Sequence, residues 1–149
     1  MKIRTGTLAE LKKQGKKFAC LTSYDQQTAE IFDSAGIEVI LVGDSASNTV
    51  LANDTTIPVT LAEMIPFGNA VARSAMNSLV VFDMPFGSYE EGDSQALANA
   101  IRVMKETGVA GVKVEGRRTA QIRALVEAGI PVMGHVGFTP QTVHSLSGY

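Results

Sequence analysis

The stretch that decides the fold is VMKETGVAGVKVEG, residues 103–116. It reads as the end of a helix, a glycine, and then a short strand that carries two charges. Because successive side chains of a strand point to opposite faces, Lys113 and Glu115 share one face, and Val112 and Val114 share the other. A mostly buried strand that points two charges the same way predicts a polar site on that face.

The same pattern of helix, glycine and strand occurs twice more, in IFDSAGIEVILVGD (31–44) and ALVEAGIPVMGHVG (124–137). The glycines at 36, 108 and 129 lie where the end of a helix favours a residue with positive φ. The apolar runs that follow are typical of parallel strands covered on both faces. Alternating helices and strands predict an α/β fold with a parallel sheet and right-handed crossovers.

Five strands are expected, at residues 18–22, 39–43, 79–82, 111–114 and 131–134. Helix signals lie between and after them. Thr60 and Glu63 form a capping box, and residues 94–108 carry apolar residues at helical spacing. Thr139 is expected as an N-cap, with Pro140 at the first helical position. The one long irregular segment, 44–59, is of a length that is usually functional or mobile, and residues 1–149 are expected to form a single domain.

Composition excludes several classes of protein. The chain has 149 residues, of which 45% are hydrophobic, and its net charge is -2, so nothing favours binding to nucleic acid or to an anionic membrane. No apolar run approaches the roughly 18 residues of a membrane span, and the N-terminal residues lack a signal-peptide core. The single cysteine, Cys20, excludes an intrachain disulfide and is expected to be a small buried hydrophobe. These features favour a cytoplasmic protein.

Polar or charged residues lie at the C-terminal end of each predicted strand: Ser23, Tyr24 and Asp25, Asp44 and Ser45, Asp83, Lys113 and Glu115, and His135. The carboxyl ends of parallel strands form the edge where ligands bind, so these side chains are expected to converge. Three carboxylates from separate strands suit Mg²⁺, which prefers oxygen ligands. A lysine beside them would neutralise a substrate carboxylate or enolate.

Each of these residues also has a purely structural interpretation. An aspartate after a strand often forms a turn or caps a helix, which is the role expected for Asp25. Lys113 and Glu115 would make an ion pair at the rim, and His135 would pack in the core. His144 is expected to be exposed, and Asp54 to serve a turn or a lid contact. No phosphate-binding glycine loop and no serine elbow is present, so the residues alone predict a ligand site without naming the ligand.

Six blocks are similar, in order and spacing, to the ketopantoate hydroxymethyltransferase family: LTSYD (21–25), LVGDS (41–45), DTTIPVT (54–60), DMPFGSY (83–89), VKVEG (112–116) and GHVGFTPQ (134–141). The resemblance runs over residues 2–149. It implies a (β/α)₈ barrel of TIM-barrel type, related to the phosphoenolpyruvate mutase and isocitrate lyase group. It also implies transfer of a hydroxymethyl group from 5,10-methylenetetrahydrofolate to 3-methyl-2-oxobutanoate, giving 2-dehydropantoate in pantothenate biosynthesis.

The resemblance further implies roles for individual residues. Asp44, Asp83 and Glu115 would bind Mg²⁺, which chelates the 2-oxo acid and stabilises its enolate. Asp44, Ser45, Asp83 and Lys113 would form the substrate site. Lys113 and His135 are the candidate catalytic residues.

The family's proposed general base is a glutamate on a later strand, beyond residue 149. About five strands cannot close an eight-stranded barrel, which usually needs about 250 residues. We therefore expect an N-terminal part of the barrel that is inactive in isolation, and a ring-like homo-oligomer, commonly a decamer in the family. The alternatives are a related Mg²⁺-dependent 2-oxo acid lyase or mutase, and a non-catalytic binding piece that lacks the base.

Overall fold

The structure, a computed structural model, describes residues 2–146. Its helices and strands alternate along the chain: α1 Thr5–Lys13, β1 Cys20–Thr22, α2 Gln26–Ser34, β2 Val39–Val42, α3 Ala46–Thr49, α4 Leu61–Ser74, β3 Leu79–Asp83, α5 Asp93–Thr107, β4 Gly111–Glu115, α6 Thr119–Glu127, β5 Val132–His135 and the 3₁₀ helix η1 Pro140–Thr142. Among these residues, no helix has the length and apolar character required to cross a lipid bilayer.

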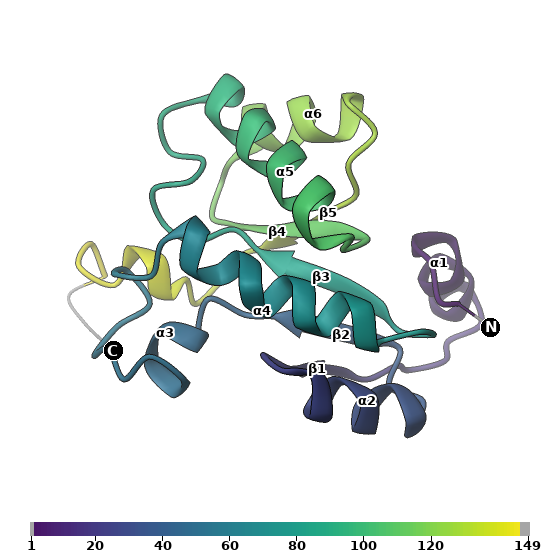
Figure 1. The fold of residues 1–149 in the computed structure, drawn as a ribbon. Coiled ribbons are helices and arrows are strands. Elements are labelled where there is room, and N and C mark those ends of the chain that lie inside the picture. The colour runs from purple at the N-terminus through teal and green to yellow at the C-terminus, as the bar shows by residue number, and fades with distance from the viewer. Residues whose placement is uncertain (1, 147–149) are drawn as a thin grey trace.

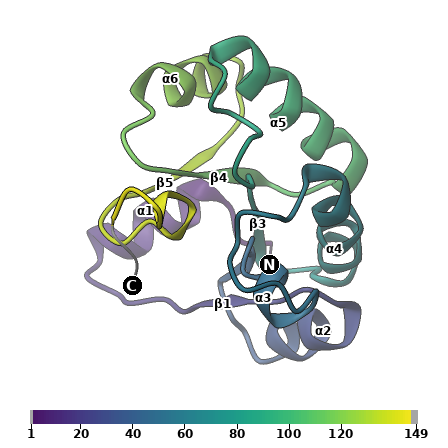
Figure 2. The ribbon, with the colours of Figure 1, turned by 90° about the vertical axis from the view of Figure 1, so that its left-hand side faces the viewer.

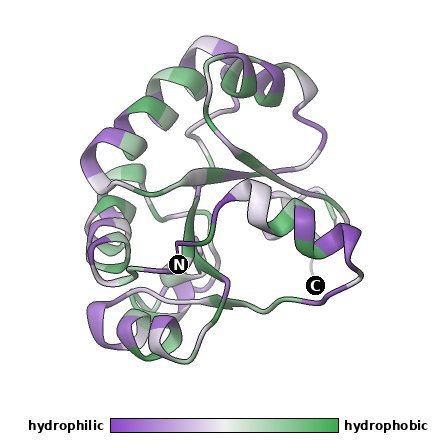
Figure 3. Ribbon diagram, turned by 90° about the vertical axis from the view of Figure 1, so that its right-hand side faces the viewer, coloured by the Kyte–Doolittle hydropathy of each residue, from purple (hydrophilic) through white to green (hydrophobic). Residues whose placement is uncertain are grey.

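The five strands form one parallel sheet in the order β1-β2-β3-β4-β5. Figure 1 shows α4 in front of the strands, with α5 and α6 above them and α2 below. Figure 2, viewed toward the C-terminal ends of the strands, shows these helices as an arc around the outside of the curved sheet. Helix α1 lies across the opposite face (Figure 3). Sequential parallel strands with helices on the outside form the wall of a (β/α)₈ barrel, which confirms the predicted fold class.

The two faces of the sheet bury separate apolar clusters. Outward side chains such as Val80 and Phe82 pack with residues of the outer helices. Helix α4 approaches Phe82 so closely that a Cβ at Gly68 would lie 2.8 Å from the ring. On the inner face, Val39 and Val81 pack with partly buried residues of the N-terminal segment. Burying each such side chain contributes about 1.5–3 kcal/mol, so both faces help to hold the strands in register.

The predicted helix boundaries have the expected local causes. Thr60 accepts a hydrogen bond from Glu63 N, and the Glu63 carboxylate accepts one from Thr60 N, which completes the capping box of α4. Asp25 caps α2 by accepting from Thr28 N at 2.9 Å. Gly108 ends α5 with φ 78°, a left-handed conformation that glycine adopts at little cost.

The strand boundaries differ from the predicted ones by one or two residues. β1 begins at Cys20 instead of residue 18, and β2 ends at Val42 instead of residue 43. The other three strands each extend one residue further than expected, so that Asp83, Glu115 and His135 are their last residues. The backbones of these three residues therefore belong to the sheet and not to loops, so the sheet sets where their side chains begin.

The expectation that every strand is covered on both faces is wrong for the two edge strands. All three residues of β1 are exposed, and those of β5 are exposed or half-buried. Cys20 is exposed, not buried as expected. It pairs in register with Val39, which faces the inner side of the sheet, and it lies on the edge strand β1.

The segment 44–59 is more ordered than its sequence suggested. It contains the short helix α3, and its turns are joined by side-chain hydrogen bonds. Ser47 Oγ donates to the carbonyl of Thr55 at 2.7 Å, and the Asn48 amide donates to the carbonyl of Asn53 at 3.0 Å. These bonds stabilise a compact loop directly after Asp44.

Asp33, in α2, attaches the start of β3 to the helical layer. Its Oδ1 accepts hydrogen bonds from the backbone N–H groups of Asn77 and Ser78 at 2.8 and 2.6 Å. The Ser78 hydroxyl and the Asn77 amide also donate to this carboxylate. Burial opposes ionisation, but these hydrogen bonds outweigh it and lower the pKa of Asp33 to about 2. The ionised carboxylate therefore stabilises the folded state.

We predict that Asp33→Ala lowers the free energy of unfolding of the intact protein by about 1–2 kcal/mol at neutral pH, since hydrogen bonds to a partly exposed charge are lost. Because the folded pKa lies below the ordinary 3.8, this contribution is complete above pH 4 and disappears as the pH falls toward 2. Urea denaturation at several pH values checks both statements. The exposed Asp54→Ala is the control, and a difference between wild type and Asp33→Ala that does not change with pH would contradict the assignment.

Candidate metal centre

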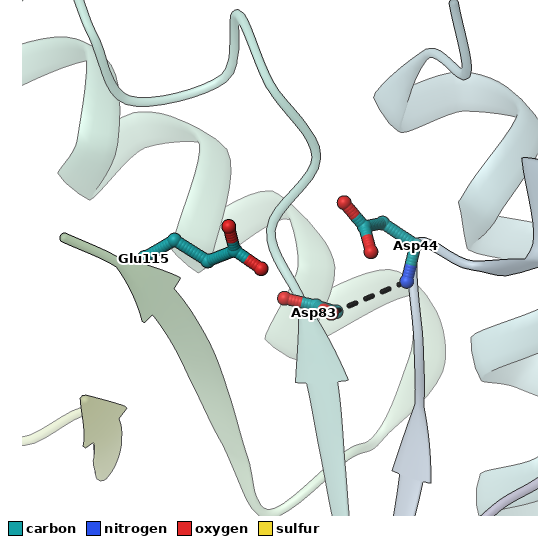
Figure 4. Close-up of side chains that lie close together, drawn as sticks. All are labelled: Asp44, Asp83 and Glu115. Carbon is teal, nitrogen blue, oxygen red and sulfur yellow. Dashed lines mark hydrogen bonds between the residues drawn. The ribbon is translucent and has the colours of Figure 1, made fainter. Parts of the chain in front are cut away.

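Three carboxylates meet at the C-terminal edge of the sheet. Asp44 follows β2, Asp83 ends β3 and Glu115 ends β4, and each offers an oxygen within 4.8 Å of the others. All three are buried, with exposed fractions of 4, 1 and 3%. Figure 4 shows the carboxylates pointing toward one another. The structure thus brings together the residues proposed from sequence as metal ligands.

The register of the sheet explains this convergence. Asp83 pairs with Lys113 across β3 and β4, and Glu115 pairs with His135 across β4 and β5. Paired residues of neighbouring parallel strands point to the same face, so these four side chains share the inner face of the sheet. Asp44 joins them from the first turn after β2, where its backbone N–H donates to Asp83 Oδ2 at 3.2 Å (Figure 4).

Lys113 lies between two of the carboxylates. Its Nζ is 2.6 Å from Asp83 Oδ2 and 3.2 Å from Glu115 Oε1. Burial alone would lower the pKa of Lys113, but the neighbouring carboxylates, Asp83 first, outweigh burial and raise it. Lys113 is therefore a buried ammonium group. The structure confirms that Lys113 and Glu115 share a face, and it shows that they form an ion pair.

The charges in this cluster do not balance. Three carboxylates surround one ammonium, so two negative charges remain uncompensated when all four groups are ionised. Burial raises the pKa of Asp44, and burial together with repulsion from Asp44 raises that of Asp83. A divalent cation would remove this conflict, because its charge favours the ionised carboxylates.

One fully buried oxygen of the cluster lacks a hydrogen-bond partner among the described residues. Asp83 Oδ1 is buried, and none of the described residues donates to it. A buried acceptor without a partner costs about 1–3 kcal/mol, and coordination to a cation would satisfy it. The ligand set consists of carboxylate oxygens only, which is the chemistry of Mg²⁺ and not that of a structural zinc. The residues present therefore fit a hard divalent cation.

The remaining candidates lie around this cluster. His135 is half-buried, and its Nδ1 is 3.1 Å from Glu115 Oε1. The Ser45 hydroxyl lies 2.7 Å from Tyr24 Oη and does not bond to a carboxylate. His144 is exposed, as predicted.

Two buried residues of the cluster had no role assigned from sequence: Tyr89 and Gln141, which are 1% and 2% exposed. Gln141 donates to Asp44 Oδ2 from its side chain and to Glu115 Oε2 from its backbone, and the Tyr89 hydroxyl donates to Gln141 Oε1. Neither residue directly follows a strand, so the pattern of polar residues at strand ends did not single them out. Their one sequence signal is that each is the last residue of a block similar to the family. Pro140 does begin a helix as expected, although that helix is a single 3₁₀ turn.

Comparison with solved structures identifies the fold class. Phosphonopyruvate hydrolase in complex with oxalate and Mg²⁺ is similar with a TM-score of 0.69 at 12% identity, over 95% of this chain and 53% of that one. 2,3-Dimethylmalate lyase, a member of the PEP mutase/isocitrate lyase superfamily, is similar with a TM-score of 0.62 at 16% identity, over 87% of this chain and 51% of that one. The described residues have the fold of about half of these α/β barrel chains.

Sequence comparison identifies the family. The family described as ketopantoate hydroxymethyltransferase matches residues 2–149. The 3-methyl-2-oxobutanoate hydroxymethyltransferases of Leifsonia xyli subsp. xyli and Saccharopolyspora erythraea are 56% and 58% identical over 99% of this chain, and the match covers 54% and 51% of those proteins. The chain belongs to the ketopantoate hydroxymethyltransferase family, which confirms the resemblance. It spans about half the length of the curated relatives it matches.

We predict that Mg²⁺ raises the melting temperature of the intact protein, because an ion that binds only the folded state stabilises it by about 2.7 kcal/mol at 100 times its Kd. Asp83→Asn should abolish most of this increase, since it removes one negative charge and one ligand oxygen. Differential scanning fluorimetry with and without Mg²⁺ measures the effect, and Asp54→Asn is the control. An equal increase in Asp83→Asn and wild type would contradict a metal role for Asp83.

Proposed function

We propose that the protein transfers a hydroxymethyl group from 5,10-methylenetetrahydrofolate to 3-methyl-2-oxobutanoate and so forms 2-dehydropantoate. The observation that carries the proposal is the buried cluster of three carboxylates and one lysine at the strand ends. The names of the relatives, at more than half identical residues, support the same reaction. We further propose, from the family resemblance, a cytoplasmic homo-oligomer whose partners are these small molecules.

Asp44, Asp83 and Glu115 would hold Mg²⁺ in this reaction. When bound, the ion would withdraw electron density from the keto oxygen of the substrate and so ease loss of the proton from C3. The buried Oδ1 of Asp83 lacks a hydrogen-bond partner among the described residues and is the best-supported ligand atom. Glu115 differs, because both of its oxygens already accept hydrogen bonds, which suits contact through water.

Lys113 would bind the oxo acid directly. An ammonium group has three N–H donors, and two of them point to Asp83 and Glu115. The third is able to donate to an oxygen of the substrate. The positive charge of Lys113 would stabilise the negative charge that develops as the C3 proton leaves, and in a buried site such an interaction is stronger than in water.

Two residues at the rim complete the proposed site. The Ser45 hydroxyl, held by Tyr24, would donate to the substrate carboxylate, and Asp44 would contribute through the cation that it holds. His135 donates from Nδ1 when its partner is the carboxylate of Glu115, so a neutral ring presents a lone pair at Nε2. We propose that His135 uses Nε2 to hold a proton during the reaction.

The alternative is a lyase or mutase of the kind seen in the structural neighbours. Such an enzyme would use the same carboxylate cluster but no folate. The folate requirement therefore separates the two reactions.

We predict that the intact protein forms 2-dehydropantoate only when 5,10-methylenetetrahydrofolate is present. Asp83→Asn should reduce kcat/KM by at least about 100-fold, because a group that stabilises developing charge contributes this much or more. Mass spectrometry of the product measures both effects, with Asp54→Asn as the control. Turnover of the oxo acid without folate would favour the lyase, and an undiminished rate in Asp83→Asn would reject the metal role.

A further inference from the structure

Gln141 connects three strand ends of the site. Its Nε2 donates to Asp44 Oδ2 and to the carbonyl of Met84, each at 2.9 Å, and its backbone N–H donates to Glu115 Oε2 at 3.2 Å. These partners follow β2, follow β3 and end β4, respectively. Gln141, which lies in η1, thus contacts two of the three carboxylates of the cluster, those of Asp44 and Glu115.

The orientation of the Gln141 amide is determined by its neighbours. A carboxylate oxygen and a carbonyl oxygen both require a donor, which only the NH₂ group provides. The amide oxygen then faces Tyr89, whose hydroxyl donates to it. The opposite orientation would place oxygen against two acceptors, so the side chain has one stable arrangement.

Tyr89 closes a ring of hydrogen bonds. The backbone N–H of Glu115 donates to the Tyr89 hydroxyl at 3.2 Å, that hydroxyl donates to Gln141, and Gln141 N–H donates back to the Glu115 carboxylate. Every polar atom of the Gln141 side chain is used, and the ring is buried. Hydrogen bonds linked in this way in a buried site strengthen one another and fix their members.

Hydrogen bonds occupy one oxygen of each aspartate in the cluster, and Gln141 makes the one to Asp44. Gln141 engages Oδ2 of Asp44, and among the described residues nothing donates to Oδ1 of that carboxylate. Asp83 likewise uses Oδ2 for Lys113 and Asp44 N, while its Oδ1 has no described partner. Each aspartate is therefore held by one oxygen and offers the other.

From these contacts we infer that Gln141, oriented by Tyr89, is a positioning residue that holds the carboxylates of Asp44 and Glu115 for a divalent cation. The inference rests on the proposed function only in its choice of Mg²⁺ as the natural ion. Gln141 needs no contact with substrate or metal for this role, because it acts through the carboxylates. Groups that orient metal-binding side chains typically change metal affinity by 10–100-fold when they are removed.

The test is Mn²⁺ binding to the intact protein, measured by electron paramagnetic resonance of the free ion. Gln141→Met preserves the length of the side chain but removes its donors and its acceptor, and it should weaken binding of Mn²⁺ about tenfold or more. Tyr89→Phe leaves the bond between Gln141 and Asp44 in place, so it should weaken binding less.

Gln95→Met is the matched control. Gln95 also donates to a backbone carbonyl, that of Gly87, and accepts from a backbone N–H, that of Glu91, but it contacts no carboxylate of the cluster. Thermal melting in EDTA is expected to show some loss of stability in both glutamine variants, whereas only Gln141→Met should weaken Mn²⁺ binding. An affinity within twofold of wild type in Gln141→Met would overturn the inference. If that variant does not fold, a wild-type affinity in Tyr89→Phe overturns it.

The product assay on wild type keeps the two proposals separate. A wild-type protein that forms 2-dehydropantoate, combined with normal Mn²⁺ affinity in Gln141→Met, would reject the positioning role and retain the proposed function. A wild-type protein that forms no product, combined with weakened Mn²⁺ binding in Gln141→Met, would support the positioning role and reject the proposed function. Absence of Mn²⁺ binding to wild type would reject both.

Discussion

Three carboxylates and one ammonium are buried together at one edge of a parallel sheet, and the rest of the site depends on how their charges are balanced. Removing charged groups from water costs several kcal/mol each unless they are paired and hydrogen-bonded. With all four groups ionised, Lys113 would compensate one carboxylate and leave two negative charges, and Asp83 retains a buried oxygen without a described partner. If the cluster were only a structural ion pair, its excess negative charge would destabilise the folded protein. A divalent cation would compensate that charge.

The fold supplies the geometry that this site requires. In-register pairing of β3 with β4 and of β4 with β5 places Asp83, Lys113, Glu115 and His135 on one face. Helices cover the outer face, and α1 packs across the inner face near the N-terminal ends of the strands, so the polar groups collect at the other end (Figures 2 and 3). Gln141 then connects the strand ends from a segment distant in sequence. The sheet thus sets the positions of the charged groups, and Gln141 contacts the carboxylates of Asp44 and Glu115.

The features that could be predicted from the sequence are those that depend on residues close together in the chain. The alternation in GVKVE indicated that Lys113 and Glu115 share a face, and the charged residues after apolar runs indicated a common edge. The roles of Tyr89 and Gln141 depend on contacts across 52 residues of sequence, for which no local pattern gives a signal. Cys20 was misassigned because an apolar run indicates a strand but does not indicate whether the sheet continues beyond it. The residues alone did not identify the ligand, and the ligand proposed above comes from the family resemblance.

Membership of the ketopantoate hydroxymethyltransferase family and the carboxylate cluster lead to the same central claim, that a divalent cation binds among Asp44, Asp83 and Glu115. The most direct measurement is the anomalous scattering of Mn²⁺ in crystals of the intact protein. The account predicts one strong anomalous peak in contact with carboxylate oxygens of Asp44 and Asp83, with Lys113 still beside Asp83. A peak elsewhere, or none at saturating Mn²⁺ while these side chains keep their present arrangement, would contradict it.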